Sequence, residues 1–261
     1  MADNILTFTM EGSVAHIRLT NPARGNVLDM AMIKELATVS ESLAKGQARS
    51  VLISAEGKNF CVGGDIQAFA STDDRGGLLN AMAGRLHEGL KAINISGLPV
   101  VVAVNGAAAG AGLSLASSGD IVLGGKGSSY MLAYTALGFT ADGGATYFLP
   151  RLIGMRRTQE MFYTNRRLSA DEAQDWGLIT RVVDDEALLD EAMAVAQSLA
   201  SGPTYAFRRI KAMLEQTLGN TLDAQLNLET DAISASAASP DGGAGVQAFL
   251  TRGKAEFTGK A

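Results

Sequence analysis

The feature of this sequence that most restricts its fold is an alternation of short apolar runs with longer amphipathic segments. Runs typical of short buried strands lie at 51–54, 100–104 and 121–123. Apolar residues at helical spacing are found at about 28–43, 78–95, from 111 onward and 144–149. Together with a hairpin predicted from 5–8 and 14–19, this order indicates an α/β protein with crossover connections.

The pattern changes beyond a turn at 201–203, where strand signals disappear. Helical patterns run to 218, from 221 to 235, and from 245 to 252. The sequence therefore predicts a core over residues 1–200 and a C-terminal helical region over residues 201–261. Amphipathic helices with no sheet to cover pack best on another subunit, and a charged content of only 19% also indicates covered surface, so we expect an oligomer.

Charge and composition exclude several classes of protein. The 261 residues carry a net charge of -5, which gives no general attraction to nucleic acid or to anionic membranes. One cysteine and two histidines cannot supply a disulfide framework or a cluster of soft metal ligands, so we expect no metal. Residues 1–11 lack the basic and apolar regions of a secretion signal, which predicts a cytoplasmic protein.

A long uncharged stretch at 92–119 does not predict a membrane span. Pro99, Asn105 and several glycines interrupt it, and spanning requires a more continuous hydropathy. The stretch instead predicts a strand followed by a tight turn.

Two glycine-rich turns, at 59–66 and 105–112, follow predicted strands. Glycine can hold backbone conformations that point an N–H group at a ligand, and the second turn opens a helix whose first N–H groups are unpaired. Two such donors can converge on one oxygen, or the glycines can serve close packing of helix on strand. Neither turn has the glycine and lysine spacing of a nucleotide-binding loop.

Residues 60–66 and 99–112 resemble the two oxyanion-hole motifs of the crotonase (enoyl-CoA hydratase/isomerase) superfamily. Further segments are similar to the family's landmarks, in the family's order, at 21–28, 120–122, 143–151, 168–178 and 249–257. The resemblance implies a crotonase-type spiral of ββα units with a C-terminal helical oligomerisation region, assembled as a homotrimer or a dimer of trimers. It also implies an acyl-CoA thioester as ligand, with coenzyme A entering as part of the substrate and no permanently bound cofactor. By the same resemblance, the N–H groups of Gly64 and Ala111 hold the thioester oxygen.

The acid and base groups separate the possible reactions. Hydratases of the superfamily use two glutamates, and Ser114 and Tyr134 stand at the matching positions here. A single carboxylate, Asp142, lies nearby, and one base can lift a proton from one carbon and return it to another. We therefore expect an enoyl-CoA isomerase-type double-bond shift through a thioester enolate, with Asp142 as the catalytic acid and base. The alternatives are an enoyl-CoA hydratase, an acyl-CoA hydrolase or dehalogenase, a non-catalytic acyl-CoA-binding member, and for Asp142 a purely structural role as helix N-cap.

Several other residues resemble substrate contacts. The resemblance implies that the backbone at Asp65 and Ile66 cradles adenine, that Tyr134 lines the pocket, and that Arg24 and Arg252 contact coenzyme A. His87 matches a histidine that assists dehalogenase-type relatives, although a lone helical histidine is more often structural. Surface charge explains the two arginines equally well. Structural roles are predicted for Cys61 and Trp176, and His16, in an alternating strand, is predicted to be exposed or structural. Fatty acid and aromatic acid degradation both remain open as pathways.

Overall fold

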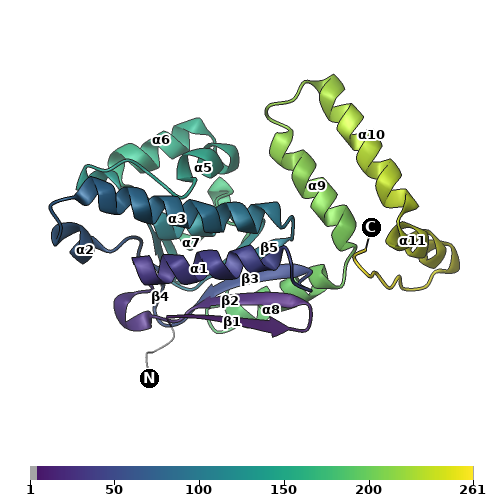
Figure 1. The fold of residues 1–261 in the computed structure, drawn as a ribbon, viewed down its shortest axis with the longest axis horizontal. Coiled ribbons are helices and arrows are strands. Elements are labelled where there is room, and N and C mark those ends of the chain that lie inside the picture. Colours follow the sequence, from purple (N-terminus) through teal and green to yellow (C-terminus); the bar gives the residue numbers. More distant parts are fainter. Residues whose placement is uncertain (1–4, 261) are drawn as a thin grey trace.

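A computed structural model describes residues 5–260 (Figure 1). Residues 1–4, which begin the segment assessed for a secretion signal, and residue 261 lie outside the described residues. The larger sheet is six-stranded, in the order β1 (Leu6–Glu11), β2 (Val14–Leu19), β3 (Ser50–Ala55), β5 (Val100–Val104), β7 (Ile121–Gly125) and β10 (Arg181–Val183). Strands β1 and β2 form the predicted antiparallel hairpin, and the remaining neighbours pair in parallel.

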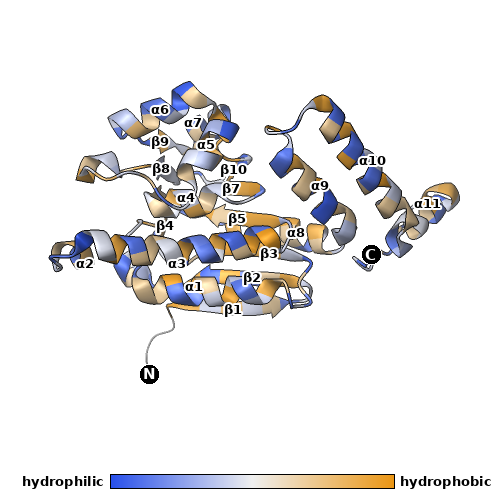
Figure 2. Ribbon diagram, turned by 45° about the horizontal axis from the view of Figure 1, so that its top comes forward, coloured by the Kyte–Doolittle hydropathy of each residue, from blue (hydrophilic) through white to orange (hydrophobic). Residues whose placement is uncertain are grey.

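The central strands β3, β5 and β7 of the larger sheet are buried on both faces, and their alternate residues point to opposite sides. Val51 and Ile53 of β3 join the core that includes helices α1 (Met30–Leu43) and α3 (Arg75–Ile95). Leu52 faces the other way and packs with α8 (Leu188–Ala200). This two-sided burial explains why the sequence shows continuous apolar runs here, visible as the hydrophobic length of β5 (Figure 2).

A second, four-stranded sheet lies beyond the first, in the order β4 (Asn59–Cys61), β6 (Ala107–Ala109), β8 (Ser129–Met131) and β9 (Leu168–Ser169). Each of β3, β5 and β7 runs on into a short strand of this sheet and then into a helix, which is the spiral of ββα units that the resemblance implies. The sequence predicted only a turn over 105–112. That prediction was incomplete, because Ala107–Ala109 is too short and too weakly β-forming to give a strand pattern of its own.

Helices around the second sheet complete the core. They are α2 (Ile66–Ala70), α4 (Ala111–Ser117), α5 (Ala145–Ile153), α6 (Met155–Thr164) and α7 (Ala170–Trp176), with short 3-10 turns η1 (Pro22–Arg24) and η2 (Thr135–Leu137). Within residues 5–260, none of the helices has the length and apolar character that crossing a bilayer would require.

The C-terminal helices extend from the core as an arm (Figure 1). The arm consists of α9 (Thr204–Gln216), α10 (Leu222–Ala238) and α11 (Pro240–Thr251). The prediction that the last helix begins near residue 245 was wrong by five residues, because the Ser239 side chain accepts from the N–H of Gly242 and Pro240 occupies the first helical position.

Hydrogen bonds connect the segment that follows α11 to the core and to the start of α11. Arg49, just before β3, donates to the backbone oxygens of Phe257 and Gly202 and to the hydroxyl of Thr204. Asp241 is 3% exposed and accepts from the N–H and hydroxyl of Thr258 and from the N–H of Gly259. Residues 257–259 are thereby fixed between the core and α11.

Asp241→Asn is expected to lower the free energy of unfolding by about 1–3 kcal/mol at neutral pH, because the N–H of Gly259 loses its acceptor. Burial opposes ionisation of Asp241, but hydrogen bonds from Thr258 and Gly259 outweigh burial and hold its pKa below the ordinary value. A carboxylate with a lowered folded-state pKa stabilises the fold above its unfolded pKa of about 4, and this contribution is lost as pH falls through the folded pKa. Thermal melts should therefore show a wild-type advantage that is largest near neutral pH and shrinks below about pH 4. An advantage that stays constant into strong acid would contradict this account.

Candidate active site

A cavity of about 600 Å³ opens where both glycine-rich turns, α3 and the loop before α5 meet. Its walls are mainly apolar, and Phe69 and Phe139 meet edge to face with ring centres 6.2 Å apart. Among the described residues that line this cavity, Asp142 is the single carboxylate and His87 the single histidine. Of the other predicted site residues, those that also line the cavity are Gly64, Ile66, Ala111 and Tyr134.

The two glycine-rich turns lie against each other at the ends of β4 and β6. Gly63 has a φ of +95°, and a Cβ built on it would lie 2.9 Å from the oxygen of Ala109 and 3.6 Å from the nitrogen of Ala111. Its carbonyl accepts from the N–H of Leu28. Within the described chain, neither Gly64 nor Ala111 donates its N–H to another protein group, so both donors are available to a ligand.

Glycine also serves close packing here, as the alternative interpretation predicted. A Cβ on Gly112 would lie 2.3 Å from the backbone oxygen of Cys61, so α4 approaches β4 more closely than any larger residue would permit. The same turns therefore combine tight helix–strand packing with exposed N–H groups.

Asp142 is held by a small hydrogen-bond network. The hydroxyl of Tyr134 donates to its Oδ1 at 2.6 Å, and the hydroxyl of Ser114 donates to its backbone oxygen at 3.0 Å. The two hydroxyl oxygens are 2.9 Å apart. The second carboxylate oxygen, Oδ2, has no hydrogen-bond partner within residues 5–260 and is not buried, so it is open to the cavity.

Tyr134 acts as a hydrogen-bond donor in this network. Burial raises the pKa of Tyr134 far above its ordinary value, and the charge of Asp142 raises it further. The phenol therefore stays protonated and keeps donating to Oδ1. The prediction that Asp142 could be an N-cap was wrong, because Gly144 occupies the N-cap position of α5 and no side chain caps that helix.

His87, on α3, reaches the same loop from the opposite wall. Its Nε2 lies 3.0 Å from the nitrogen of Gly143 and accepts from that N–H. A ring nitrogen that accepts carries no proton, so the imidazole is neutral with its proton on Nδ1. The structure thus brings His87 to the residue that follows Asp142.

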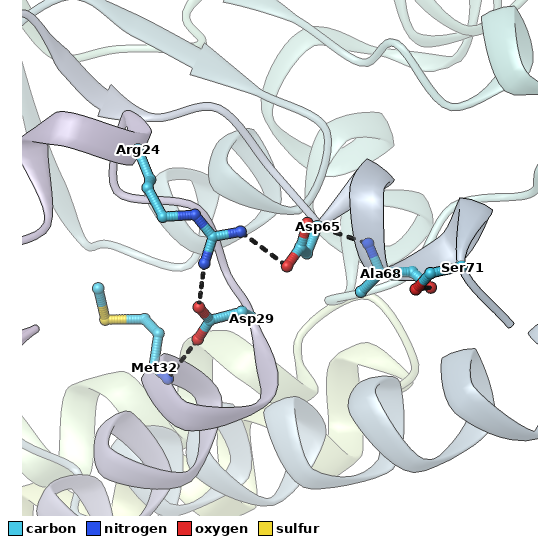
Figure 3. Close-up of polar contacts among 6 residues, drawn as sticks. All are labelled: Arg24, Asp29, Met32, Asp65, Ala68 and Ser71. Carbon is cyan, nitrogen blue, oxygen red and sulfur yellow. Dashed lines mark hydrogen bonds and ion pairs between the residues drawn. The ribbon is translucent and has the colours of Figure 1, made fainter.

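Arg24 lies outside the cavity wall, between two carboxylates (Figure 3). It donates to Asp29 and to Asp65, each at 2.8 Å, and Asp65 also caps α2 by accepting from Ala68. Burial opposes ionisation of Asp65, but the hydrogen bonds from Arg24 and Ala68 outweigh it and hold the pKa below its ordinary value. The guanidinium charge is therefore already balanced before any phosphate arrives.

Arg252 is far from this site within the chain. It forms the C-cap of α11, at the opposite end of the molecule from α2, and its side chain is exposed (Figure 1). The structure therefore does not bring Arg252 to the cavity of its own chain.

His16 and Trp176 both have structural settings, and the alternative prediction that His16 is exposed was wrong. His16 is 7% exposed, and its two ring nitrogens lie 2.8 Å from Glu11 and from Ser54. Trp176 packs against the core under two arginine side chains. Sequence analysis did not single out the cavity residues Phe69, Leu79 and Asn80, because their types and spacing do not distinguish a cavity wall from a helix surface.

Cys61 is expected to be inert toward thiol reagents in the folded protein. It is fully buried, and burial raises the pKa of its thiol to about 12. Labelling with a chromogenic disulfide at pH 8 should therefore proceed at the rate of unfolding and become fast on addition of denaturant. A complete burst of labelling in the native protein would show that the thiol is accessible.

Comparison with known proteins shows the family to which the chain belongs. The sequence profile of the family described as enoyl-CoA hydratase/isomerase matches residues 9–260. The chain is 36% identical over its full length, and over the relative's full length, to 1,2-epoxyphenylacetyl-CoA isomerase of Escherichia coli. A solved structure from Mycobacterium abscessus, described provisionally as an enoyl-CoA hydratase/isomerase, superposes with a TM-score of 0.93 at 36% identity, covering 98% of this chain and 100% of the other. The chain belongs to the enoyl-CoA hydratase/isomerase family, within the crotonase superfamily, and is an enzyme of that family.

The relatives differ in the reaction that they carry out. The crotonyl-CoA hydratase of Syntrophomonas wolfei is 30% identical, with all of both chains covered. A 4-chlorobenzoyl coenzyme A dehalogenase from Arthrobacter is 25% identical, covering 92% of this chain and 88% of its own. Membership therefore defines the fold and the class of enzyme, and the reaction depends on the side chains around the cavity.

Proposed function

We propose that this enzyme is an acyl-CoA isomerase that shifts a carbon–carbon double bond through a thioester enolate. The observation that carries the proposal is Asp142, the single carboxylate of the described cavity wall, with Oδ1 fixed by Tyr134 and Oδ2 open. The N–H groups of Gly64 and Ala111 face the thioester oxygen in this proposal. Coenzyme A enters as part of the substrate, without a permanently bound cofactor.

The proposed reaction is a redistribution of one proton. Oδ2 of Asp142 takes a proton from the carbon next to the thioester, and the electron pair moves into a conjugated enolate. Negative charge that develops on the thioester oxygen is stabilised by the two N–H groups, which are already oriented. Asp142 then returns the proton to the far end of the conjugated system, so the product is an isomer of the substrate.

The network around Asp142 disfavours hydration. Hydration needs one group to activate water and another to protonate carbon, and two carboxyl groups divide these tasks naturally. Here Ser114 donates a hydrogen bond to the backbone oxygen of Asp142, and Tyr134 stays protonated. Neither side chain therefore acts as the second acid or base that hydration needs.

A second candidate function is the isomerisation of an aromatic acyl-CoA epoxide. It is favoured by the Escherichia coli relative, which is named 1,2-epoxyphenylacetyl-CoA isomerase. The apolar walls and the edge-to-face pair of Phe69 and Phe139 suit a ring or a conjugated chain.

A substrate panel tests these functions directly. Wild-type enzyme should convert trans-3-enoyl-CoA into the conjugated isomer and hydrate trans-2-enoyl-CoA slowly, as followed by chromatography of the thioesters. Conversion of 1,2-epoxyphenylacetyl-CoA in preference to both would support the second candidate. Rapid hydration of the 2-enoyl substrate without any double-bond shift would overturn the proposal.

The arm of α9–α11 is proposed to be the oligomerisation region, in a trimer or a dimer of trimers. It presents large apolar side chains to solvent, such as Leu218 at 69% and Phe249 at 86% exposure. Sedimentation of the purified protein tests this proposal, and a monomer at micromolar concentration would contradict it. Within such an assembly, Arg252 could meet only a coenzyme A bound by a neighbouring chain.

A further inference from the structure

His87 contacts the loop of Asp142 but takes no part in the proposed proton transfer. His87 lines the cavity, and its Nε2 accepts from the N–H of Gly143 at 3.0 Å. The imidazole is therefore neutral and acts as an acceptor toward the backbone. Because Gly143 directly follows Asp142, this contact fixes one end of the peptide unit that carries the catalytic carboxylate.

The loop at 142–144 depends on such contacts for its shape. Gly143 and Gly144 both have positive φ angles, +59° and +81°, so the chain turns sharply just after Asp142. A Cβ on Gly143 would lie 2.7 Å from the Cβ of Ser114. Glycine backbones resist rotation weakly, and polar contacts must therefore hold the turn. Ser114 holds the backbone oxygen of Asp142, Tyr134 holds Oδ1, and His87 holds the following N–H.

We propose that His87 is a positioning residue whose neutral imidazole, by accepting from Gly143, aims Oδ2 of Asp142 at the substrate. The inference rests on the proposed function of Asp142. It makes a chemical distinction: His87 acts through its acceptor nitrogen and transfers no proton to the substrate.

Protonation of His87 breaks this arrangement. An imidazolium has N–H groups at both nitrogens, so Nε2 would face the N–H of Gly143 as donor against donor. An imidazolium at position 87 would therefore lose the contact that holds the loop of Asp142.

Other charges surround His87 at greater exposure. Helix α3 itself carries Arg85, Glu88 and Lys91, and α1 contributes Glu41. Further along α3, Tyr147 and Arg151 of α5 lie near Asn94. Arg85 pairs with Glu41 and Glu88 at the surface, where water and salt screen these charges. Asp142 and Tyr134 are the ionisable groups that share the cavity with His87.

Two variants separate an acceptor role from proton transfer. His87→Gln replaces Nε2 by an amide oxygen that accepts but does not titrate, and His87→Leu removes the acceptor. We expect the glutamine variant to keep kcat within about threefold of wild type, because its amide oxygen can accept the same hydrogen bond. The leucine variant should lose about 10-fold in kcat across the whole pH range with little change in KM, corresponding to about one misplaced hydrogen bond. Lys91→Leu, an exposed position one turn further along α3, should match wild type.

The outcomes are decisive once thermal melts show that each variant is folded. Equal losses in the glutamine and leucine variants would mean that His87 itself transfers a proton, and this would overturn the positioning role. Wild-type kcat in the leucine variant would show that the contact with Gly143 has no function. The proposed role of Asp142 is tested separately. An active Asp142→Asn variant would exclude Asp142 from the mechanism, whatever kcat is measured for the His87 variants.

Discussion

Asp142→Asn is expected to lower kcat for double-bond isomerisation by about 10²–10⁴-fold, the usual contribution of a general acid–base group. The amide has nearly the shape of the carboxylate, and its oxygen can still accept the hydrogen bond from Tyr134 at Oδ1. It cannot take a proton at the position of Oδ2, which is the oxygen open to the cavity. The loss should therefore fall on the chemical step and leave thioester affinity within about threefold, since the apolar walls are unchanged.

The measurement is a comparison of kcat and of the dissociation constant for a non-reactive acyl-CoA thioether. Asp74→Asn provides the matched control, because Asp74 is an exposed N-cap of α3 that accepts from Gly77, and asparagine caps equally well. The control should have wild-type kcat. An Asp142→Asn enzyme with more than about one tenth of wild-type kcat would exclude Asp142 as the proton carrier.

Ala111→Pro is expected to lower kcat by about 10²–10³-fold, the effect of removing one preoriented donor from a site of developing negative charge. Ala111 is the first residue of α4, where proline is well tolerated, and its N–H makes no hydrogen bond within the described chain. The substitution removes the donor and places ring carbon where the thioester oxygen is proposed to lie. The helix keeps its internal hydrogen bonds, and thermal melts check that the variant is folded.

Leu222→Pro tests whether the loss is specific to the site. Leu222 is also the first residue of a helix, α10, and is 75% exposed, and Thr221 before it has the extended backbone that a following proline requires. This variant should retain wild-type kcat. Near-normal turnover in a folded Ala111→Pro protein would show that the Ala111 N–H does not face the reacting oxygen.

The sequence predicted five of the six strands of the larger sheet and missed β10, and the central strands were clearest because burial on both faces leaves a strong signal. Residues 100–104 are uniformly apolar, and they form β5 as expected. The smaller sheet left no such signal. Its strand Ala107–Ala109 owes its conformation to β4 and β8 on either side, and neighbours that are distant in sequence do not appear in a local pattern.

The site was likewise predicted in part. Motif similarity placed Gly64, Ala111, Tyr134, His87 and Asp142 in one region, and all of them line one cavity in the structure. It did not foresee that Ser114 holds the backbone oxygen of Asp142 or that His87 accepts from Gly143, because both contacts involve the main chain. The pairing of Arg24 with two carboxylates was also missed, since it joins residues 24 and 65 through the fold.

The two available donors beside the cavity belong to the peptide backbone at the ends of β4 and β6, and this has an evolutionary consequence. A codon change at position 111 alters a side chain but leaves an N–H in place unless the new residue is proline. Selection can therefore exchange the residues at 114, 134 and 142 while the two proposed donors persist, provided that the glycines that shape the two turns are kept. A lineage built in this way can diversify its reactions by a few point mutations, which accords with relatives named isomerase, hydratase and dehalogenase on one scaffold.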